Sequence, residues 1–112
     1  MTRSKYNSRI TYVDGIRFAS QAEAHRYAEL KLLLRAGEIS DLKLQPKFEI
    51  LPKHTDGAGK KHRAAYYIGD FEYIENGKRV VEDVKGKPTE LFRLKAKMFV
   101  QLYPAIDFRI VK

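Results

Sequence analysis

Residues 65–86 read AYYIGDFEYIENGKRVVEDVKG, and this stretch decides the fold because it encodes two strands joined by a tight turn. Segments rich in Tyr, Ile and Val are typical of strands, and Asn76-Gly77 is a preferred sequence for a β-hairpin turn. Side chains two residues apart in a strand point to the same face. Asp83 and Lys85 are therefore expected side by side, with Asp70 on the neighbouring strand within reach of both.

The segments before this hairpin predict a second hairpin, a helix and a strand. Residues 9–19 form the hairpin, because Asp14-Gly15 between β-branched residues favours a type I′ turn. The apolar spacing within residues 21–36 predicts an amphipathic helix. Residues 39–51 alternate between apolar and polar side chains, which indicates one strand, and Pro46 suggests an edge or a bend within it.

The remaining segments complete a mixed α/β (α+β) domain. Residues 52–63 contain two glycines and several basic residues, and they predict a flexible basic loop. A second helix is expected over residues 89–103, and the last apolar residues predict a final strand. The predicted order is ββ-α-β-ββ-α-β, a mixed central β-sheet flanked by two helices. Residues 1–112 are expected to form a single domain, because the length leaves no room for a second.

The composition narrows the possible partners. The 22 Lys and Arg residues outnumber the 14 Asp and Glu residues, so the formal net charge is +8. Such a charge on a small domain favours a polyanionic partner, most often nucleic acid, although a basic protein without such a partner has the same composition. The chain has no cysteine and no long apolar segment. We therefore expect no disulfide, no membrane partner and a cytoplasmic location.

Two carboxylates and an ammonium group at one place in a sheet suggest metal-dependent chemistry. Mg²⁺ prefers oxygen ligands and commonly uses one or two carboxylates together with a substrate phosphate. Asp70 and Asp83 are the candidate metal ligands. Lys85 could hold an attacking water molecule or neutralise developing negative charge. The simpler alternative is a cross-strand ion pair on the surface, worth about 0.2–1 kcal/mol.

The chain also carries a series of short motifs in a fixed order. These are Lys5-Tyr6-Asn7, Phe18-Ala19-Ser20-Gln21-Ala22-Glu23-Ala24, Gln45-Pro46-Lys47-Phe48, Asp70-Phe71 and Val81-Glu82-Asp83-Val84-Lys85-Gly86. In this order they resemble the PD-(D/E)XK nuclease superfamily, and in particular small phage-encoded endonucleases of the Holliday-junction-resolvase type. The resemblance covers nearly the whole chain. Gly69 is a departure, because the superfamily motif has Pro before the first Asp.

The resemblance implies a fold and an activity. It implies a restriction-endonuclease-like core and a Mg²⁺-dependent endonuclease, with Mn²⁺ able to substitute, that hydrolyses phosphodiester bonds in branched, junction or duplex DNA. The setting would be phage replication, recombination or packaging in the host cytoplasm. Symmetric cutting of a junction would require a homodimer. It assigns Asp70 and Asp83 to the metal, and Lys85 to catalysis.

Three acidic residues near these motifs are open to more than one interpretation. The resemblance places Glu23 among the catalytic residues, whereas Ser20-x-x-Glu23 is also a capping box, in which the glutamate only stabilises the helix end. Glu82 should face away from Asp83 and is expected to be structural, unless a bulge in the strand rotates it toward the site. Glu72 is expected toward solvent, as a partner of Lys78 or Arg79.

Basic residues away from the carboxylates are candidates for DNA contacts. Phosphate contacts position a protein on DNA without reading its sequence. The candidates lie in the basic loop and in and beside a basic N-terminal arm, residues 1–8: Lys53, Lys60, Lys61, Arg63, Lys5 and Arg9. The alternative function is a nucleic-acid-binding protein that has a nuclease-like fold but no catalytic activity.

Overall fold

The computed structural model describes residues 9–112, which form a mixed α+β fold of two helices and ten strands. The helices are α1 (Gln21–Arg35) and α2 (Glu90–Leu102). The strands are β1 (Thr11–Val13), β2 (Ile16–Phe18), β3 (Ser40–Leu44), β4 (Lys47–Leu51), β5 (His54–Thr55), β6 (Lys61–His62), β7 (Ala65–Ile68), β8 (Phe71–Glu75), β9 (Lys78–Val84) and β10 (Asp107–Val111).

The central sheet has four strands in the order β10-β9-β8-β3. β8 and β9 form the antiparallel hairpin predicted at Asn76-Gly77, whose two residues have φ values of 52° and 75°. β3 pairs with β8 in antiparallel fashion, and β10 pairs with β9 in parallel. The sheet is therefore mixed, as predicted, and β9 lies at its centre beside β8.

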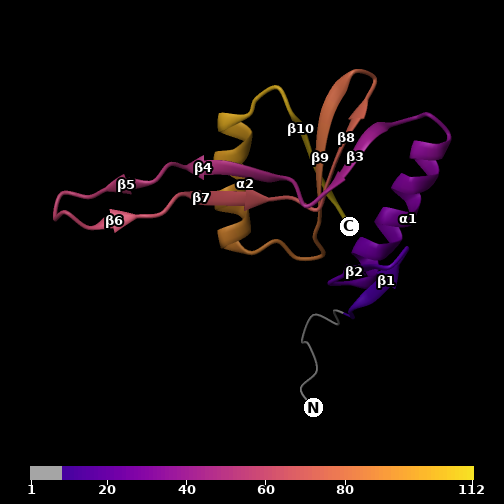
Figure 1. Cartoon of the computed structure of the whole chain (residues 1–112), viewed down its shortest axis with the longest axis horizontal. Coiled ribbons are helices and arrows are strands. Elements are labelled where there is room, and N and C mark those ends of the chain that lie inside the picture. Colours follow the sequence, from indigo (N-terminus) through magenta and orange to yellow (C-terminus); the bar gives the residue numbers. More distant parts are fainter. Residues whose placement is uncertain (1–8) are drawn as a thin grey trace, which may run out of the picture.

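The two faces of this sheet are covered by different elements. On one face, Tyr27 and Leu30 of α1 pack with Phe71 of β8 and Val80 of β9. On the other face, the core joins α2 to β9 and to the hairpin formed by β4 and β7. Figure 1 shows α1 on one side of the sheet, and α2 behind β4 and β7 on the other. The molecule thus has a separate core on each side of β9.

Both helices begin and end close to the predicted residues. Ser20 caps α1 by accepting a hydrogen bond from the backbone N–H of Glu23 at 3.1 Å, and Thr89 caps α2 in the same way through Phe92. Such caps satisfy backbone donors that have no partner within the helix. After α1 the chain turns at Gly37, whose φ of 79° is the left-handed conformation that glycine favours.

Two predicted strands are each divided in two by a sharp break. β3 and β4 are separated at Gln45-Pro46, and β7 and β8 at Gly69-Asp70. The two breaks hold each other, because Gln45 N donates to Asp70 O and Gly69 N donates to Pro46 O, both at 3.0 Å. Gln45 has a φ of 51°, which is uncommon for a residue with a side chain. One continuous strand over 39–51, and one over 65–74, were therefore wrong predictions.

The prediction of a flexible loop over residues 52–63 was also wrong. Its residues extend the β4–β7 hairpin through the short strands β5 and β6, which pair His54 with His62 and Thr55 with Lys61. We call residues 52–64 the β5–β6 arm; it projects away from the body of the molecule (Figure 1). The sequence did not predict these two strands, because neither face of the arm is apolar and the usual alternation of apolar and polar residues is missing.

Candidate active site at the end of the β8–β9 hairpin

Asp70 occupies the residue just before β8, where the chain changes direction. Its backbone N–H donates to Glu82 O at 2.9 Å, so the residue stays paired with β9. Its carboxylate Oδ2 accepts a hydrogen bond from Val84 N at 2.7 Å. The register that pairs Phe71 with Glu82 brings Asp70 opposite Asp83. Asp70 was expected on the strand next to Asp83. It instead lies in the bend just before β8, and its pairing with Glu82 keeps it beside Asp83 of β9.

Gly69 is what allows the chain to pass so close to β9. A Cβ atom at this position would lie 2.9 Å from Val81 Cγ1 and 3.5 Å from Glu82 O. No side chain fits there without displacing one of these neighbours. This close approach explains in physical terms why glycine occupies position 69.

Asp83 is a buried carboxyl group that shares its surroundings with Asp70. Only 3% of the residue is exposed, and Tyr67 Oη donates a hydrogen bond of 2.6 Å to its Oδ2. Burial raises the pKa of Asp83 to about 7, and the neighbouring charge of Asp70 contributes in the same direction. Burial likewise raises the pKa of Asp70. The two carboxyl groups are close enough to interact directly, and their ionised forms repel each other.

Lys85 extends from the same face of β9 as Asp83. Its Nζ lies 3.9 Å from Asp83 Oδ1 and 5.0 Å from the centre of the Phe92 ring. Its side chain is 40% exposed, whereas that of Asp83 is 5% exposed. The pair is thus not the exposed surface ion pair that we considered from the sequence, because one partner is buried beside a second carboxyl group.

Glu23 comes from α1 and lies beside Asp70. Burial raises the pKa of Glu23, and the charge of Asp70 raises it further, whereas the backbone N–H of Ala19 and the charge of Lys85 lower it. In the capping-box interpretation, the carboxylate would bond to Ser20 N. The hydrogen bonds of residues 9–112 include Glu23 N to Ser20 Oγ but not this reciprocal bond. Only the Ser20 half of the capping box is formed, and the Glu23 carboxylate interacts with the backbone of Ala19 and with the charge of Asp70.

A small open pocket of about 140 Å³ reaches Glu23 and Asp70, whereas Asp83, Lys85 and Tyr67 are not part of its lining. Its polar lining comes from Arg17, Glu23, Gln45 and Asp70. Sequence reasoning did not identify Tyr67, which bonds to Asp83, or Arg17, which lines the pocket, because both positions depend on the fold. The positive φ of Gln45, which turns the chain at the pocket, also leaves no signal in a sequence read alone.

The donor set fits a hard divalent cation bound together with a substrate. Within residues 9–112, no group of three His, Asp or Glu side chains converges to form a complete metal site. Two neighbouring carboxyl groups with raised pKa values are present, and Mg²⁺ commonly binds one or two carboxylates and takes its other ligands from water and phosphate. Asp70 and Asp83 are the side chains that would hold such an ion.

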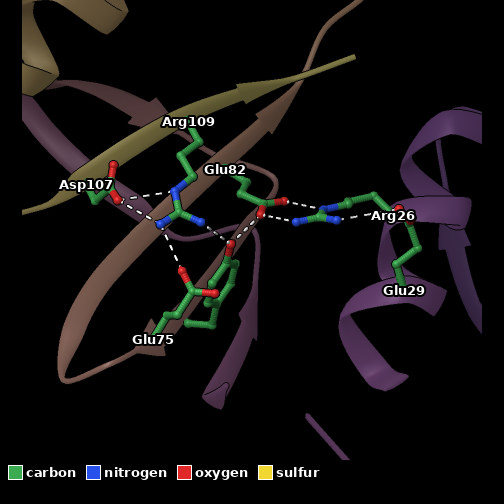
Figure 2. A network of polar contacts seen from close by, with 7 residues as sticks. Arg26, Glu29, Glu75, Glu82, Asp107 and Arg109 are labelled. Carbon is green, nitrogen blue, oxygen red and sulfur yellow. Dashed lines mark hydrogen bonds and ion pairs between the residues drawn. The ribbon is translucent and has the colours of Figure 1, made fainter. Parts of the chain in front are cut away.

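The opposite face of β9 has a structural task. Glu82 is fully buried and accepts two hydrogen bonds from Arg26 of α1, at 2.8 and 2.6 Å, and one from Tyr73. Figure 2 shows this group joined through the tyrosine to Arg109, which also binds Glu75 and Asp107. Within the described residues, Glu82 therefore serves the packing of α1 on the sheet, as strand alternation predicted.

The predicted position of Glu72, in the same part of the sheet, was wrong. It was expected toward solvent, but it is only 6% exposed. Its partner is Arg79, one of the two partners that were predicted. Arg79 Nε lies 2.7 Å from Glu72 Oε2. Arg79 in turn lies over the Phe48 ring, which covers the ion pair from the side of β4.

The candidate DNA contacts lie on both sides of this site. Lys53, Lys60, Lys61 and Arg63 are exposed on the β5–β6 arm, and Arg9 is exposed before β1. Lys5 and the basic N-terminal arm of residues 1–8 lie outside the described residues. Neither helix of the described chain has the length and apolar character needed to cross a membrane.

Comparison with known proteins places the chain in a family but assigns it no activity. No curated protein and no solved structure matches it. A family model described as "Protein of unknown function (DUF1064)" matches residues 3–112, which is nearly the whole chain. Because the match spans nearly all of its residues, this chain belongs to the DUF1064 family.

Proposed function

We propose that this protein is a metal-dependent DNA endonuclease. The observation that carries the proposal is the pair of carboxyl groups, Asp70 in the bend before β8 and Asp83 on β9, held beside each other with Lys85 next to Asp83. A purely structural carboxyl pair would gain nothing from this proximity, because each ionised group raises the free energy of the other. A divalent cation bound to a phosphodiester would offset this repulsion, because both carboxylates could then bind the ion.

The protein groups have separable tasks in this proposal. Asp70 and Asp83 would hold Mg²⁺, for which Mn²⁺ could substitute, and the ion would supply activation of water and stabilisation of charge on the phosphate. Tyr67 orients the Asp83 carboxylate through its hydrogen bond. Lys85 is placed to stabilise negative charge that develops during hydrolysis. Glu23, at the pocket wall, is placed to position or deprotonate water.

The proposed relationship to known nucleases is consistent with this assignment. In support, a helix, α1, precedes the β8–β9 hairpin in the chain, and α2 and β10 follow it, with β3 to β7 between α1 and the hairpin. We propose that these elements form a PD-(D/E)XK core of the restriction-endonuclease type. The substrate we propose is branched, junction or duplex DNA, cut during phage replication, recombination or packaging in the host cytoplasm. Symmetric cutting of a four-way junction would additionally require a homodimer.

Cleavage of labelled four-way junctions, flaps and plain duplexes tests the proposal. We expect cleavage with Mg²⁺ or Mn²⁺, no cleavage with EDTA, and loss of cleavage in Asp70→Asn. The exposed Glu90→Gln variant is the matched control and should cleave like the wild type. Absence of cleavage of every DNA under all metal conditions would reject the enzyme.

The second candidate is a nucleic-acid-binding protein on a nuclease-like fold. The specific observation in its favour is the exposed basic β5–β6 arm, which could bind DNA without any chemistry. Binding without metal-dependent cleavage, unaffected by Asp70→Asn, would favour this candidate.

A further inference from the structure

The β4–β7 hairpin starts at the candidate active site, and the β5–β6 arm continues it away from the site. β4 begins two residues after Gln45, and β7 ends just before Gly69, so both strands of the hairpin originate where Asp70 is held. Near the body, Phe48, Ile50 and Tyr67 pack on α2. Beyond Leu51 and Ala65 the hairpin has no such packing, and β5 and β6 pair with each other alone.

An unpacked two-stranded hairpin in water is marginally stable, and the tip of this one is ordered by its own polar contacts. Asp56 Oδ1 accepts hydrogen bonds from Ala58 N and Lys60 N at 2.9 and 3.0 Å, and its Oδ2 lies 2.8 Å from His62 Nε2. The His54 and His62 rings stack with their centres 4.9 Å apart. The acidic group of the tip is thus used inside the turn.

The cations of the arm remain available. Lys53, Lys60, Lys61 and Arg63 are all exposed, and none of these four takes part in an ion pair with residues 9–112. The only acid among residues 52–64, Asp56, is bonded within the arm, so the four exposed cations dominate the charge of the arm. Such a surface fits a polyanion of regular charge spacing.

We propose that the arm lies along duplex DNA and binds phosphates up to one helical turn away from the site that holds the scissile phosphate. A strand advances about 3.3 Å per residue, so the tip at Ala58 can be at most roughly 40 Å from Gln45, and the four cations lie at about 20–30 Å. At about 3.4 Å per base pair, these distances correspond to roughly six to ten base pairs. The inference rests on the proposed function, which places the scissile phosphate at the candidate active site. It specifies that the substrate has an uninterrupted duplex on one side of that phosphate.

Photo-crosslinking measures this distance without requiring catalysis. The chain has no cysteine, so Ala58→Cys at the tip and Lys87→Cys beside the site can each be labelled uniquely with a photoreactive group. Both side chains are exposed. With a labelled junction or a duplex of about three helical turns in metal-free buffer, we expect both variants to crosslink, at positions about eight to twelve nucleotides apart. Glu38→Cys, in the turn between α1 and β3, is the control and should not crosslink.

The possible outcomes distinguish an error in the proposed path of the arm from an error in the proposed nuclease activity. Crosslinks fewer than about four nucleotides apart, or crosslinks from Lys87→Cys without any from Ala58→Cys, would overturn the proposed path of the arm while leaving the nuclease intact. The expected separation in a protein that cleaves no DNA would support the arm and reject the nuclease. No crosslink from either variant would overturn both.

Discussion

At the scale of single residues, Lys85 and Asp83 distinguish catalysis from binding. We expect Lys85→Ala and Asp83→Asn to lower the cleavage rate by orders of magnitude at saturating DNA and Mg²⁺, because each removes a group that acts on the reacting phosphate or its metal. DNA affinity should change little, and Asp83→Asn could even tighten it without metal, since one negative charge near the phosphate is removed. Single-turnover rates and fluorescence anisotropy measure the two effects.

The control for this pair is Lys87→Ala, because Lys87 is exposed and lies two residues farther along the same segment. It should retain the wild-type cleavage rate. Equal losses in Lys85→Ala and Lys87→Ala would mean that general positive charge matters, and that Lys85 has no specific role. Glu82→Gln, which alternation alone would suggest as a control, is unsuitable because Glu82 is buried in the contacts with Arg26 and Tyr73.

The raised pKa of Asp83 predicts how stability depends on pH. The folded value of about 7 lies above the value of about 3.9 for an unfolded aspartate, so the folded state binds this proton more tightly. The corresponding contribution to the free energy of unfolding is fully present below about pH 4 and is lost as the pH rises through about 7. In the metal-free protein, the melting temperature of the wild type relative to Asp83→Asn should therefore fall between about pH 5 and pH 8.

Mg²⁺ provides the complementary test at this position. At about pH 8 the ion should raise the melting temperature of the wild type, because it binds the folded, ionised carboxyl pair. The same addition should have a much smaller effect on Asp83→Asn. A difference between wild type and variant that does not change with pH would show that Asp83 titrates normally in the folded protein.

At the scale of elements, the two paired breaks depend on Gly69. Gly69→Ala introduces a Cβ that would lie 2.9 Å from Val81 Cγ1 and 3.4 Å from Pro46 Cγ. We expect a loss of about 1–3 kcal/mol in the free energy of unfolding, the usual range for overpacking a dense core. Gly86→Ala is the matched control, since a Cβ added at Gly86 would have no other atom within 4 Å, and it should be close to neutral in urea unfolding.

The attachment of α1 to the sheet is tested by its ion pair. Arg26→Ala leaves the buried Glu82 without its main partner, and we expect a loss of about 3–5 kcal/mol. Replacing both residues, as in Arg26→Met with Glu82→Met, should recover much of this loss, because no buried charge is then left unpaired. If the double variant is as unstable as Arg26→Ala alone, packing by the arginine stem matters more than charge.

The elements also show what the sequence could and could not reveal. Both hairpin turns, at Asp14-Gly15 and Asn76-Gly77, were predicted correctly because their backbone needs positive φ, which these residue types tolerate. The helices were predicted to within a residue at each end because their caps are local. The breaks at Gln45-Pro46 and Gly69-Asp70 were missed because each is stabilised by the other.

The candidate site follows the same division between local and distant contacts. Strand alternation correctly placed Asp83 and Lys85 together, and a local turn correctly brought Asp70 beside them. Alternation could not predict that Glu72 is buried, because the covering ring of Phe48 comes from β4, which the prediction had merged with β3. Tyr67 was missed for a similar reason, since its approach to Asp83 depends on the same break.

At the scale of the whole molecule, the net charge of +8 predicts a strong dependence of DNA binding on salt. Replacing Lys60, Lys61 and Arg63 together by Ser should reduce the slope of log K against log salt by about 2–3, if each residue contacts one phosphate. Anisotropy titrations between low and moderate salt measure the slope. The same triple change should leave the melting temperature nearly unaltered, because these side chains are exposed. An unchanged slope would mean that the arm does not touch DNA.

The parallel pairing of β9 with β10 has a consequence for protein synthesis. Residues 107–111 form β10, which pairs with the free edge of β9, the strand that carries Glu82 and Asp83. β10 is synthesised after β9, so it leaves the ribosome roughly a few seconds later. During that interval the edge of β9 is open to pairing with other nascent chains. Two adjacent carboxylates near the end of β9 are the kind of charge that discourages such pairing. The acids that hold the fold and the proposed metal would thus also protect the newly made chain from aggregation.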